Sequence, residues 1–456
     1  MLPEHPRLLP DTTIQQQGDL FLLLSPARGT WCVVDALGCR LAQSCTGEVS
    51  WRDLARDLAR RYAVTVQRAE QDVSRYLQQL QRAGLLLDER PTPAPECRPR
   101  EETAVRLRVT LHTTAGCNLT CRHCFQSPAS EGVLQGRPVP FPVLQARLDQ
   151  CQAAGAVSVV LTGGEILTHP QWRSIVSAAT ARFEVTVVTN GTLVSEEAAD
   201  FLADAGVHVQ VSLDGPDAET HDALRGPGAY ARTMAGIQRL LDRGVVPRMT
   251  WSTCVNRHNL AHISTLAQQA FTLGVGRLYL IWLAPRGCAV GNWEQLSTFA
   301  EERVALVRAL RPLLRAHHER IVVAGCGDPR ETTCPLEAGE CALIDVDGSV
   351  YPCILLADAR YRLGNTEAEG LAAALASPAA RQLRALVPAR VERIAECRAC
   401  EWRRYCRASC PGLAWLHQAD WWQHDDLCAV RREYYAQTLF GWAEERRQAS
   451  PVARES

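Results

Sequence analysis

Apolar positions alternate with polar ones in several short segments of the central part of the chain, and stretches with helical spacing separate them. These segments are residues 106–112, 157–161, 185–189, 207–213, 246–254 and 277–283. Strands that alternate with helices predict βα units around a parallel sheet, and a series of this length predicts an incomplete barrel. We therefore expect an α/β fold in which residues 104–318 form a partial (β/α)6 barrel of TIM type. Its active site would lie at the carboxyl ends of the strands.

Residues 10–88 are predicted to form a separate domain. Apolar runs at 20–24 and 31–34 flank a turn and predict a β-hairpin. Helical patterns follow, and the last of them stops at Gly84, a typical helix end. A hairpin followed by three helices is typical of a winged helix. A Pro-rich, charged stretch then predicts an extended linker over residues 89–103.

Charge and composition narrow the possible functions. The 456 residues carry a formal net charge of −1, and arginine supplies all of the positive charge because the sequence contains no lysine. The chain has no basic block of the kind that nucleic-acid binding usually requires, so we expect no nucleic-acid partner. No apolar run of membrane-spanning length and no signal-peptide pattern is evident. We therefore expect a cytoplasmic protein without a membrane partner.

The 19 cysteines are clustered and odd in number, which favours metal ligands over disulfides in a cytosolic chain. Cys117, Cys121 and Cys124 follow the first predicted barrel strand, with the aromatic Phe125 directly after them. Three thiolates hold three irons of a 4Fe–4S cube and leave one iron open to a ligand, as in a catalytic site. A zinc knuckle or reduced structural thiols are the alternatives. His123 is expected to be a solvated loop residue.

A second cysteine-rich region occupies residues 326–435. The segment from Cys341 to Cys353 predicts a hairpin with an Asp-Gly turn, which would bring its two ends together. Eight clustered thiols satisfy two four-cysteine cages, with two zinc ribbons as the alternative. The eight are Cys334, Cys341, Cys353, Cys397, Cys400, Cys406, Cys410 and Cys428. The remaining cysteines lack ligand-like spacing and are expected to pack as small side chains; they include Cys254 and Cys288.

The motif Cys117-Asn-Leu-Thr-Cys121-Arg-His-Cys124-Phe125 resembles the signature of the radical S-adenosylmethionine (radical SAM) enzymes. The resemblance implies that the open iron binds the amino and carboxylate groups of S-adenosylmethionine. One electron from the cluster would then cleave the sulfonium and release a 5′-deoxyadenosyl radical. Gly163, Gly164 and Glu165, after the second strand, are similar to the family's segment that holds the methionine amino group.

The same resemblance implies further cofactor contacts. The fourth strand ends at Ser212 and Asp214. Ser212 would contact the ribose or carboxylate of the cofactor, and Arg225 would pair with its carboxylate, since an arginine fork suits that group. Arg225 could instead be an ordinary helix-surface residue. Asn190 would line the same pocket or simply form a turn.

The C-terminal cysteines, with Arg362-Leu-Gly-Asn365 downstream, resemble the SPASM extension of radical SAM enzymes. The family's interleaving assigns Cys334, Cys341, Cys353 and Cys410 to one auxiliary 4Fe–4S cluster. It assigns Cys397, Cys400, Cys406 and Cys428 to the other. The spacing before the glycine of the family's Gly-x4-Cys motif is too long for Cys341 here, so Cys326, water or substrate could complete the first cluster instead.

The N-terminal domain resembles the leader-recognition domain of the small pyrroloquinoline-quinone (PQQ) chaperone, called D. That family binds a precursor peptide by adding it as an edge strand, so that backbone hydrogen bonds supply affinity. A structural cap or a DNA-binding winged helix are the alternatives.

Together these resemblances imply a radical SAM/SPASM maturase that abstracts a hydrogen atom from a ribosomally made precursor peptide bound through its leader. Its product would be a thioether, a carbon or ether crosslink, or an oxidative decarboxylation. An electron donor such as flavodoxin or ferredoxin would reduce the cluster. One rival is an anaerobic sulfatase-maturase-like oxidase, but Ile354 stands where that family has an acidic base. The other is a non-catalytic zinc-binding peptide adaptor.

Overall fold

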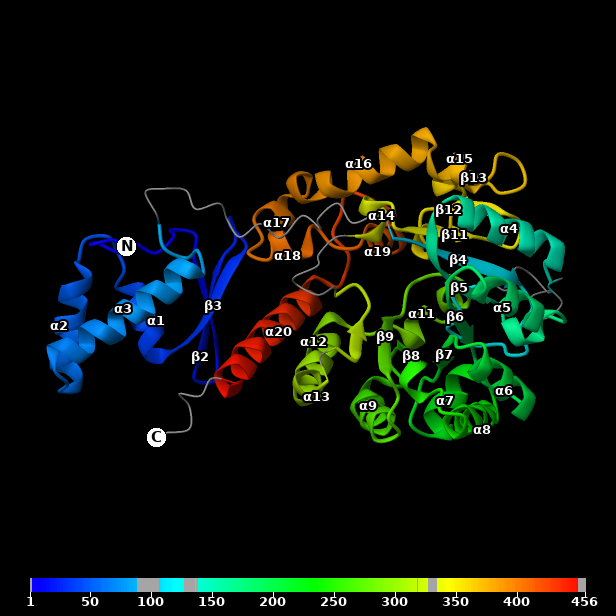
Figure 1. The fold of residues 1–456 in the computed structure, drawn as a ribbon, viewed down its shortest axis with the longest axis horizontal. Coiled ribbons are helices and arrows are strands. Elements are labelled where there is room, and N and C mark those ends of the chain that lie inside the picture. The colour runs from blue at the N-terminus through cyan, green and yellow to red at the C-terminus, as the bar shows by residue number, and fades with distance from the viewer. Residues whose placement is uncertain are drawn as a thin grey trace.

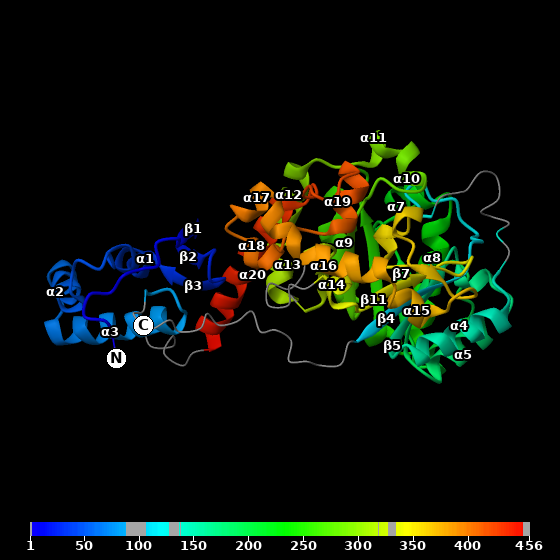
Figure 2. The same ribbon diagram turned by 90° about the horizontal axis from the view of Figure 1, so that it is seen from above.

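The computed structural model describes residues 2–87, 106–126, 136, 138–317, 319–326 and 334–449. The predicted linker, residues 89–103, lies outside them. An N-terminal domain stands at one end of an elongated molecule and a barrel at the other (Figure 1). The long C-terminal helix α20 (Cys428–Ala449) lies between the two, as the view from above also shows (Figure 2).

The N-terminal domain consists of an antiparallel sheet and the helices that follow it. The sheet has the order β1-β2-β3, so the predicted hairpin is a three-stranded sheet. The strand that the sequence pattern missed is β1, whose sequence TIQQQ has only one large apolar residue. The elements are β1 (Thr13–Gln17), β2 (Leu20–Ser25), β3 (Thr30–Asp35), α1 (Ala36–Gln43), α2 (Trp51–Tyr62) and α3 (Val66–Arg82).

Both faces of this sheet are buried. Leu23 packs with the domain's own helices in a separate small core. Leu22 and Leu24, which point to the other face, belong to the large core that contains the barrel and helix α20. The hydroxyl of Tyr405 donates to the carbonyl of Gly29 at 2.6 Å and adds a polar contact to this interface. The domain is therefore docked onto the C-terminal part of the chain through its sheet.

The barrel strands run parallel to one another and follow each other in chain order. Residues 246–248, predicted as the start of the fifth strand, form a short 3-10 turn instead, and the pattern did not predict β10 because it is only 3 residues long. The strands are β4 (Leu107–Thr114), β5 (Ala156–Gly163), β6 (Glu184–Thr189), β7 (His208–Ser212), β8 (Met249–Val255), β9 (Arg277–Trp282) and β10 (Ile321–Val323).

Helices cover the outer face of these strands. The apolar side chains Val109, Leu161 and Val187 lie on that face and are fully buried in the large core. The helices are α4 (Phe141–Ala153), α5 (Trp172–Thr180), α6 (Glu196–Asp204), α7 (Ala218–Arg225), α8 (Ala229–Asp242), α9 (Ile263–Thr272), α10 (Cys288–Gly291), α11 (Trp293–Leu296), α12 (Ala300–Ala309) and α13 (Arg311–Ala316). The predicted α/β barrel is confirmed.

The cysteine-rich C-terminal part is continuous with the barrel sheet. Strand β11 pairs in parallel with the first barrel strand β4, which gives a ten-stranded sheet that ends in β11-β12-β13. Residues 345–348 turn the chain between β11 and β12, as predicted, and Gly348 adopts φ +79° there. The elements are α14 (Pro335–Ala338), β11 (Cys341–Ile344), β12 (Ser349–Tyr351), β13 (Gly364–Asn365), α15 (Leu371–Leu375), α16 (Pro378–Arg393), α17 (Ala395–Arg398), α18 (Arg403–Cys406), α19 (Pro411–Gln418) and α20.

A buried arginine fixes this junction. Arg147 on α4 donates to the carbonyls of Asp345 and Val346, in the turn of the β11–β12 hairpin, at 3.0 and 3.2 Å. It also pairs with Glu367 at 2.8 Å, and its side chain is 3% exposed. Barrel and C-terminal part are therefore joined by both backbone pairing and charged hydrogen bonds.

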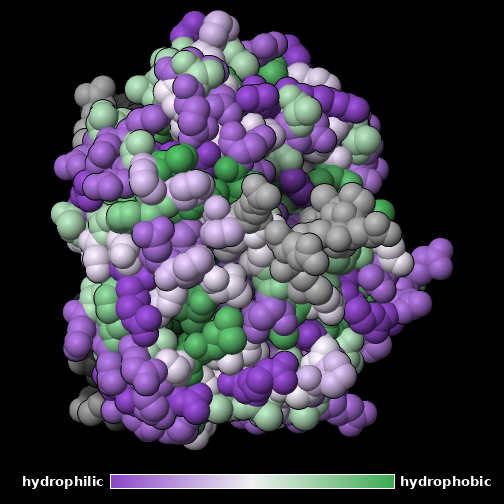
Figure 3. Space-filling model, turned by 90° about the vertical axis from the view of Figure 1, so that its right-hand side faces the viewer, coloured by the Kyte–Doolittle hydropathy of each residue, from purple (hydrophilic) through white to green (hydrophobic). Residues whose placement is uncertain are grey.

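The surface at the barrel end of the molecule shows hydrophilic side chains mixed with small hydrophobic patches (Figure 3). Among the described residues, we find no helix with the length and apolar character needed to cross a bilayer.

Candidate active site

The cluster loop, residues 116–126, leaves the carboxyl end of β4 and lies against the end of β5. The amide of Gly164 donates to the carbonyl of Thr114, and the amide of Glu165 donates to that of Gly116, both at 2.8 Å. A β-carbon at Gly164 would overlap the carbonyl oxygen of Gly116. The glycines are thus required because the loop's own backbone passes directly over them.

Burial raises the pKa of all three thiols of the cluster loop, and a hydrogen-bond donor at each sulfur opposes the rise; at Cys124 it is the amide of Gln126. Cys117 receives the amide of Leu119 and lies 3.9 Å from the side-chain nitrogen of Asn190. Arg225 Nη1 is 3.9 Å from Cys121 Sγ. Donors of this kind stabilise negative charge on sulfur, which suits thiolate ligands.

Glu165 is almost fully buried, and its carboxylate is already engaged by three donors. It accepts hydrogen bonds from the Thr189 hydroxyl at 2.8 Å, the Asn190 amide at 2.6 Å and the Leu167 amide at 3.1 Å. Burial raises the pKa of this carboxyl, and the three donors oppose the rise. Glu165 therefore locks the ends of β5 and β6 together at the site.

Asp214, at the end of β7, is the centre of a buried charged network. Its Oδ2 accepts from Arg225 Nε at 2.6 Å and lies 3.1 Å from His123 Nε2. Burial by itself would raise the pKa of Asp214, but Arg225 and His123 hold it well below its usual value. The expectation that His123 is solvated is wrong: it is 8% exposed, because Asp214 draws it into the barrel.

The other predicted cofactor residues lie around the same rim. Asn190 caps the turn after β6 and donates to Asn118 in the cluster loop at 2.9 Å. Ser212 is the last residue of β7. The ring of Phe125 lies 4.9 Å from the guanidinium of Arg286, which follows β9. The structure thus brings together residues from the ends of several strands.

Two cysteines that the sequence pattern assigned to packing lie beside the site. The amide of Cys288 donates to the carbonyl of Cys124 at 2.9 Å, and its thiol interacts with that of Cys124. Cys254, near the end of β8, lies close to Asp214 and Arg225. The sequence spacing of Cys254 and Cys288 did not indicate a place at the site. Only their positions at the ends of predicted strands could have indicated them.

The first cysteine set consists of Cys334, Cys341, Cys353 and Cys410. Cys341 and Cys353 stand at the two ends of the β11–β12 hairpin, as predicted. Burial raises the pKa of Cys341 well above its usual value, and the thiols of Cys353, Cys334 and Cys410 raise it further. Cys334, Cys341 and Cys353 pack against the same small apolar cluster. Cys326 lies instead near Arg431, Asp425 and Cys406.

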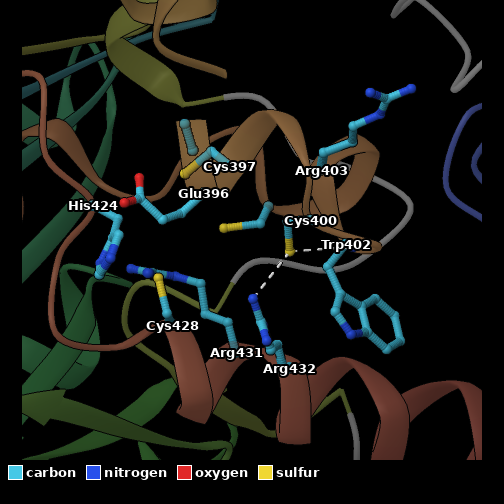
Figure 4. Close-up of a pocket in the computed structure, with 11 residues that line it drawn as sticks. Glu396, Cys397, Cys400, Trp402, Arg403, His424, Cys428, Arg431 and Arg432 are labelled. Atoms are coloured by element: carbon cyan, nitrogen blue, oxygen red, sulfur yellow. Dashed lines mark hydrogen bonds between the residues drawn. The ribbon is translucent and has the colours of Figure 1, made fainter. Parts of the chain in front are cut away.

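The second cysteine set, Cys397, Cys400, Cys406 and Cys428, lines a cavity of about 180 Å³ (Figure 4). Burial, together with Cys406 and Cys400, raises the pKa of Cys397 to about 11. Cys400 Sγ accepts from the Trp402 amide at 3.4 Å and from Arg432 at 3.6 Å, shown by the dashed lines. The sulfurs therefore share a cavity with donors aimed at them.

The thiols of both sets and of the cluster loop are the type of donor that iron–sulfur clusters require. Within the described ranges no group of three or more His, Cys, Asp or Glu side chains is close enough to hold one metal ion. A zinc ion with Zn–S bonds of about 2.3 Å requires tightly converging thiols. A 4Fe–4S cube accepts thiolates that are spread more widely.

Three family models match the chain. The Radical SAM superfamily matches residues 111–269, Coenzyme PQQ synthesis protein D (PqqD) matches 21–86, and the Iron-sulfur cluster-binding domain matches 334–401. Mycofactocin maturase MftC of Mycobacterium ulcerans (strain Agy99) is 32% identical over 279 residues, 58% of this chain and 72% of that protein. The chain belongs to the radical SAM superfamily. It is a radical SAM enzyme, for which these domains imply S-adenosylmethionine and a 4Fe–4S cluster.

A second relative matches less of its own length. The AdoMet-dependent heme synthase of Methanosarcina barkeri (strain Fusaro / DSM 804) is 37% identical over 177 residues, 38% of this chain. The match spans 50% of that relative.

Solved structures of radical SAM proteins share the fold. SuiB of Streptococcus suis, bound to precursor peptide SuiA, has a TM-score of 0.58 at 13% identity and covers 93% of this chain and 99% of its own. The protein anSMEcpe with bound AdoMet has a TM-score of 0.61 at 18% identity, over 74% and 99%. At these identities the likeness concerns the fold alone.

Proposed function

We propose that this radical SAM enzyme modifies a ribosomally made precursor peptide, which its N-terminal domain binds through the leader. The observation that carries the proposal is the fusion of a PqqD-like domain to the barrel, docked through its sheet onto α20. In the sheet order β1-β2-β3, the outer edges belong to β1 and β3, and a peptide strand could be added there.

The barrel rim supplies the cofactor site in this proposal. When bound, S-adenosylmethionine and a reduced 4Fe–4S cluster supply a 5′-deoxyadenosyl radical that takes a hydrogen atom from carbon. Cys117, Cys121 and Cys124 would hold the cluster. Arg225 keeps a guanidinium nitrogen beside Cys121 and would face the cofactor carboxylate, while Asp214 fixes its orientation.

The two cysteine sets are proposed to hold auxiliary 4Fe–4S clusters, with Cys341 rather than Cys326 completing the first. The grouping of Cys341 with the other three thiols supports this choice. Oxidation of a peptide leaves an electron to be removed, and the auxiliary sites provide a place for it. A small protein donor such as flavodoxin or ferredoxin would reduce the cluster at the loop.

Two alternatives predict different substrates. A heme-synthase-like activity would leave the N-terminal domain without a role. A sulfatase-maturase-like oxidase needs an acidic residue after Cys353, where the exposed Ile354 stands. The peptide proposal gives the N-terminal domain a role and requires no acidic residue after Cys353.

The test is anaerobic incubation of reconstituted enzyme with S-adenosylmethionine, dithionite and a candidate precursor peptide, chosen by a search of the short reading frames that neighbour its gene. We expect a mass change in the peptide, about twelve irons per chain and formation of 5′-deoxyadenosine. The Cys117/Cys121/Cys124→Ala variant should lack all chemistry, and a peptide without its leader should react poorly. An unchanged peptide with continued cofactor cleavage would contradict the proposed substrate.

A further inference from the structure

A fully buried arginine in helix α16 lacks a carboxylate partner. Arg390 is 0% exposed and donates to the carbonyls of Trp421 at 2.9 Å, Ser409 at 3.2 Å and Gln423 at 2.7 Å. Among the described residues no carboxylate forms an ion pair with it. Three carbonyls satisfy its donors. Asp425 interacts with its charge but is already paired with Arg431, so the cost of burying this positive charge is only partly offset.

This charge lies between the two cysteine sets. Ser409, whose carbonyl Arg390 holds, directly precedes Cys410 of the first set. Helix α16 leads directly into α17, which carries Cys397 of the second set. Burial lowers the pKa of Arg390. The Cys410 thiol, the Asp425 carboxylate and the Cys397 thiol oppose that effect, while Arg431 adds to it. Arg390 therefore binds the backbone next to Cys410 and lies on the helix that leads to Cys397.

The neighbouring arginines do not supply the same net charge. Arg431 forms a two-point pair with Asp425, at 2.5 and 2.6 Å, so the pair is neutral overall. Arg432 is solvent-exposed and contacts only Cys400 of the second set (Figure 4). Arg390 is therefore the buried cation that remains, and a cluster held by four thiolates is a negatively charged group.

We propose that Arg390 is a shared counter-charge for both auxiliary clusters and raises the reduction potentials of both. This inference rests on the cluster assignment in the proposed function. A reduced cluster carries one more negative charge than an oxidised one, so a nearby buried cation favours reduction. Arg390 would thus make both sites better acceptors of the electron that the peptide leaves.

The experiment is an anaerobic, EPR-monitored redox titration of the full-length chain. The Cys117/Cys121/Cys124→Ala background removes the loop cluster and isolates the two auxiliary couples. R390Q should weaken reduction of both couples at least tenfold, which is about 59 mV for a one-electron couple. R390K keeps the charge and should remain close to the parent, which separates charge from packing.

Matched variants test whether the shift in reduction potential comes from the charge of Arg390. Arg393 is exposed on the same helix, stacked on Trp422 at 4.4 Å, and R393Q should shift neither couple. R432Q should shift only the couple that disappears in Cys397→Ala. D425N removes a buried negative charge at the same place and should raise both midpoints, a measurement independent of how well R390Q folds.

Several results would overturn the inference: a shift in one couple alone, equal shifts in R390K and R390Q, a fall in D425N, or zinc in either set. None of these depends on the peptide. An unmodified peptide alongside the expected shifts would contradict the proposed substrate and leave the role of Arg390 standing.

Discussion

Single residues decide how closely the cluster loop can approach the barrel. Gly164 has no room for a β-carbon, because the loop backbone crosses it. Asp214 is fully buried and contacts both Arg225 and His123. Neither requirement can be read from one sequence position. The motif Gly163-Gly164-Glu165 predicts ligand contacts, and in the structure these residues also organise the protein around the site.

The variant G164A should destabilise the site end of the barrel. The added methyl overlaps the carbonyl of Gly116, and overpacking of this kind costs about 1–3 kcal/mol. We expect loss of about a third of the reconstituted iron together with cofactor binding, measured by iron analysis and equilibrium dialysis. Gly291 has open space around its position, so G291A is the matched control and should bind normally.

Asp214 should make the free energy of unfolding fall as the pH becomes acidic. Its folded pKa is depressed, so its contribution is complete above the unfolded value of about 3.9 and is lost as pH falls below it. D214N leaves Arg225 buried without a counter-charge and should cost about 3–5 kcal/mol at neutral pH. Urea unfolding at several pH values should show a smaller loss below pH 4 in D214N than in the parent. Equal acid sensitivity would contradict this account.

At the scale of elements, the sequence predicted those whose apolar pattern is long and regular. Strands β4 to β9 and the β11–β12 hairpin were found because alternation and an Asp-Gly turn mark them. Strand β1 was missed because its pairing depends on β2 rather than on its own apolar side chains, and β10 because it is too short. His123 was misjudged because its partner Asp214 is distant in sequence, and the positions of Cys254 and Cys288 beside the site were not predicted for the same reason.

Adjacent leucines of β2 pack in two different hydrophobic cores. L24A removes a side chain from the interface with α20, while L23A removes one from the domain's own core. Each should cost about 2–5 kcal/mol. Hydrogen exchange should rise in α20 for L24A, and in α2 and α3 for L23A. If both variants loosened the same helices, the sheet would not divide the two cores.

At the scale of the whole molecule, the barrel and the cysteine-rich part behave as one body. The pairing of β11 with β4 extends the sheet across both, and Arg147 links α4 to the hairpin turn. The first cysteine set is thus placed relative to the barrel rim by the sheet itself. A substitution that weakens this junction should therefore destabilise both the barrel and the cysteine-rich part.

R147M should weaken this junction by about 3 kcal/mol, since it removes the charged hydrogen bonds to the carbonyls of Asp345 and Val346 and the ion pair with Glu367. Differential scanning calorimetry under anaerobic conditions should show a lower melting temperature or a split transition. The pair of Arg182 with the exposed Asp149 is the matched control, and R182M should change stability by less than about 1 kcal/mol.

The pairing of β4 with β11 has a practical consequence for engineering. Exchange of C-terminal halves between related enzymes would pair β4 of one parent with β11 of another, and a poor fit there would expose an edge of β4 that invites aggregation. Grafts should therefore carry β4 and β11 from the same parent, with the crossover placed outside residues 107–344.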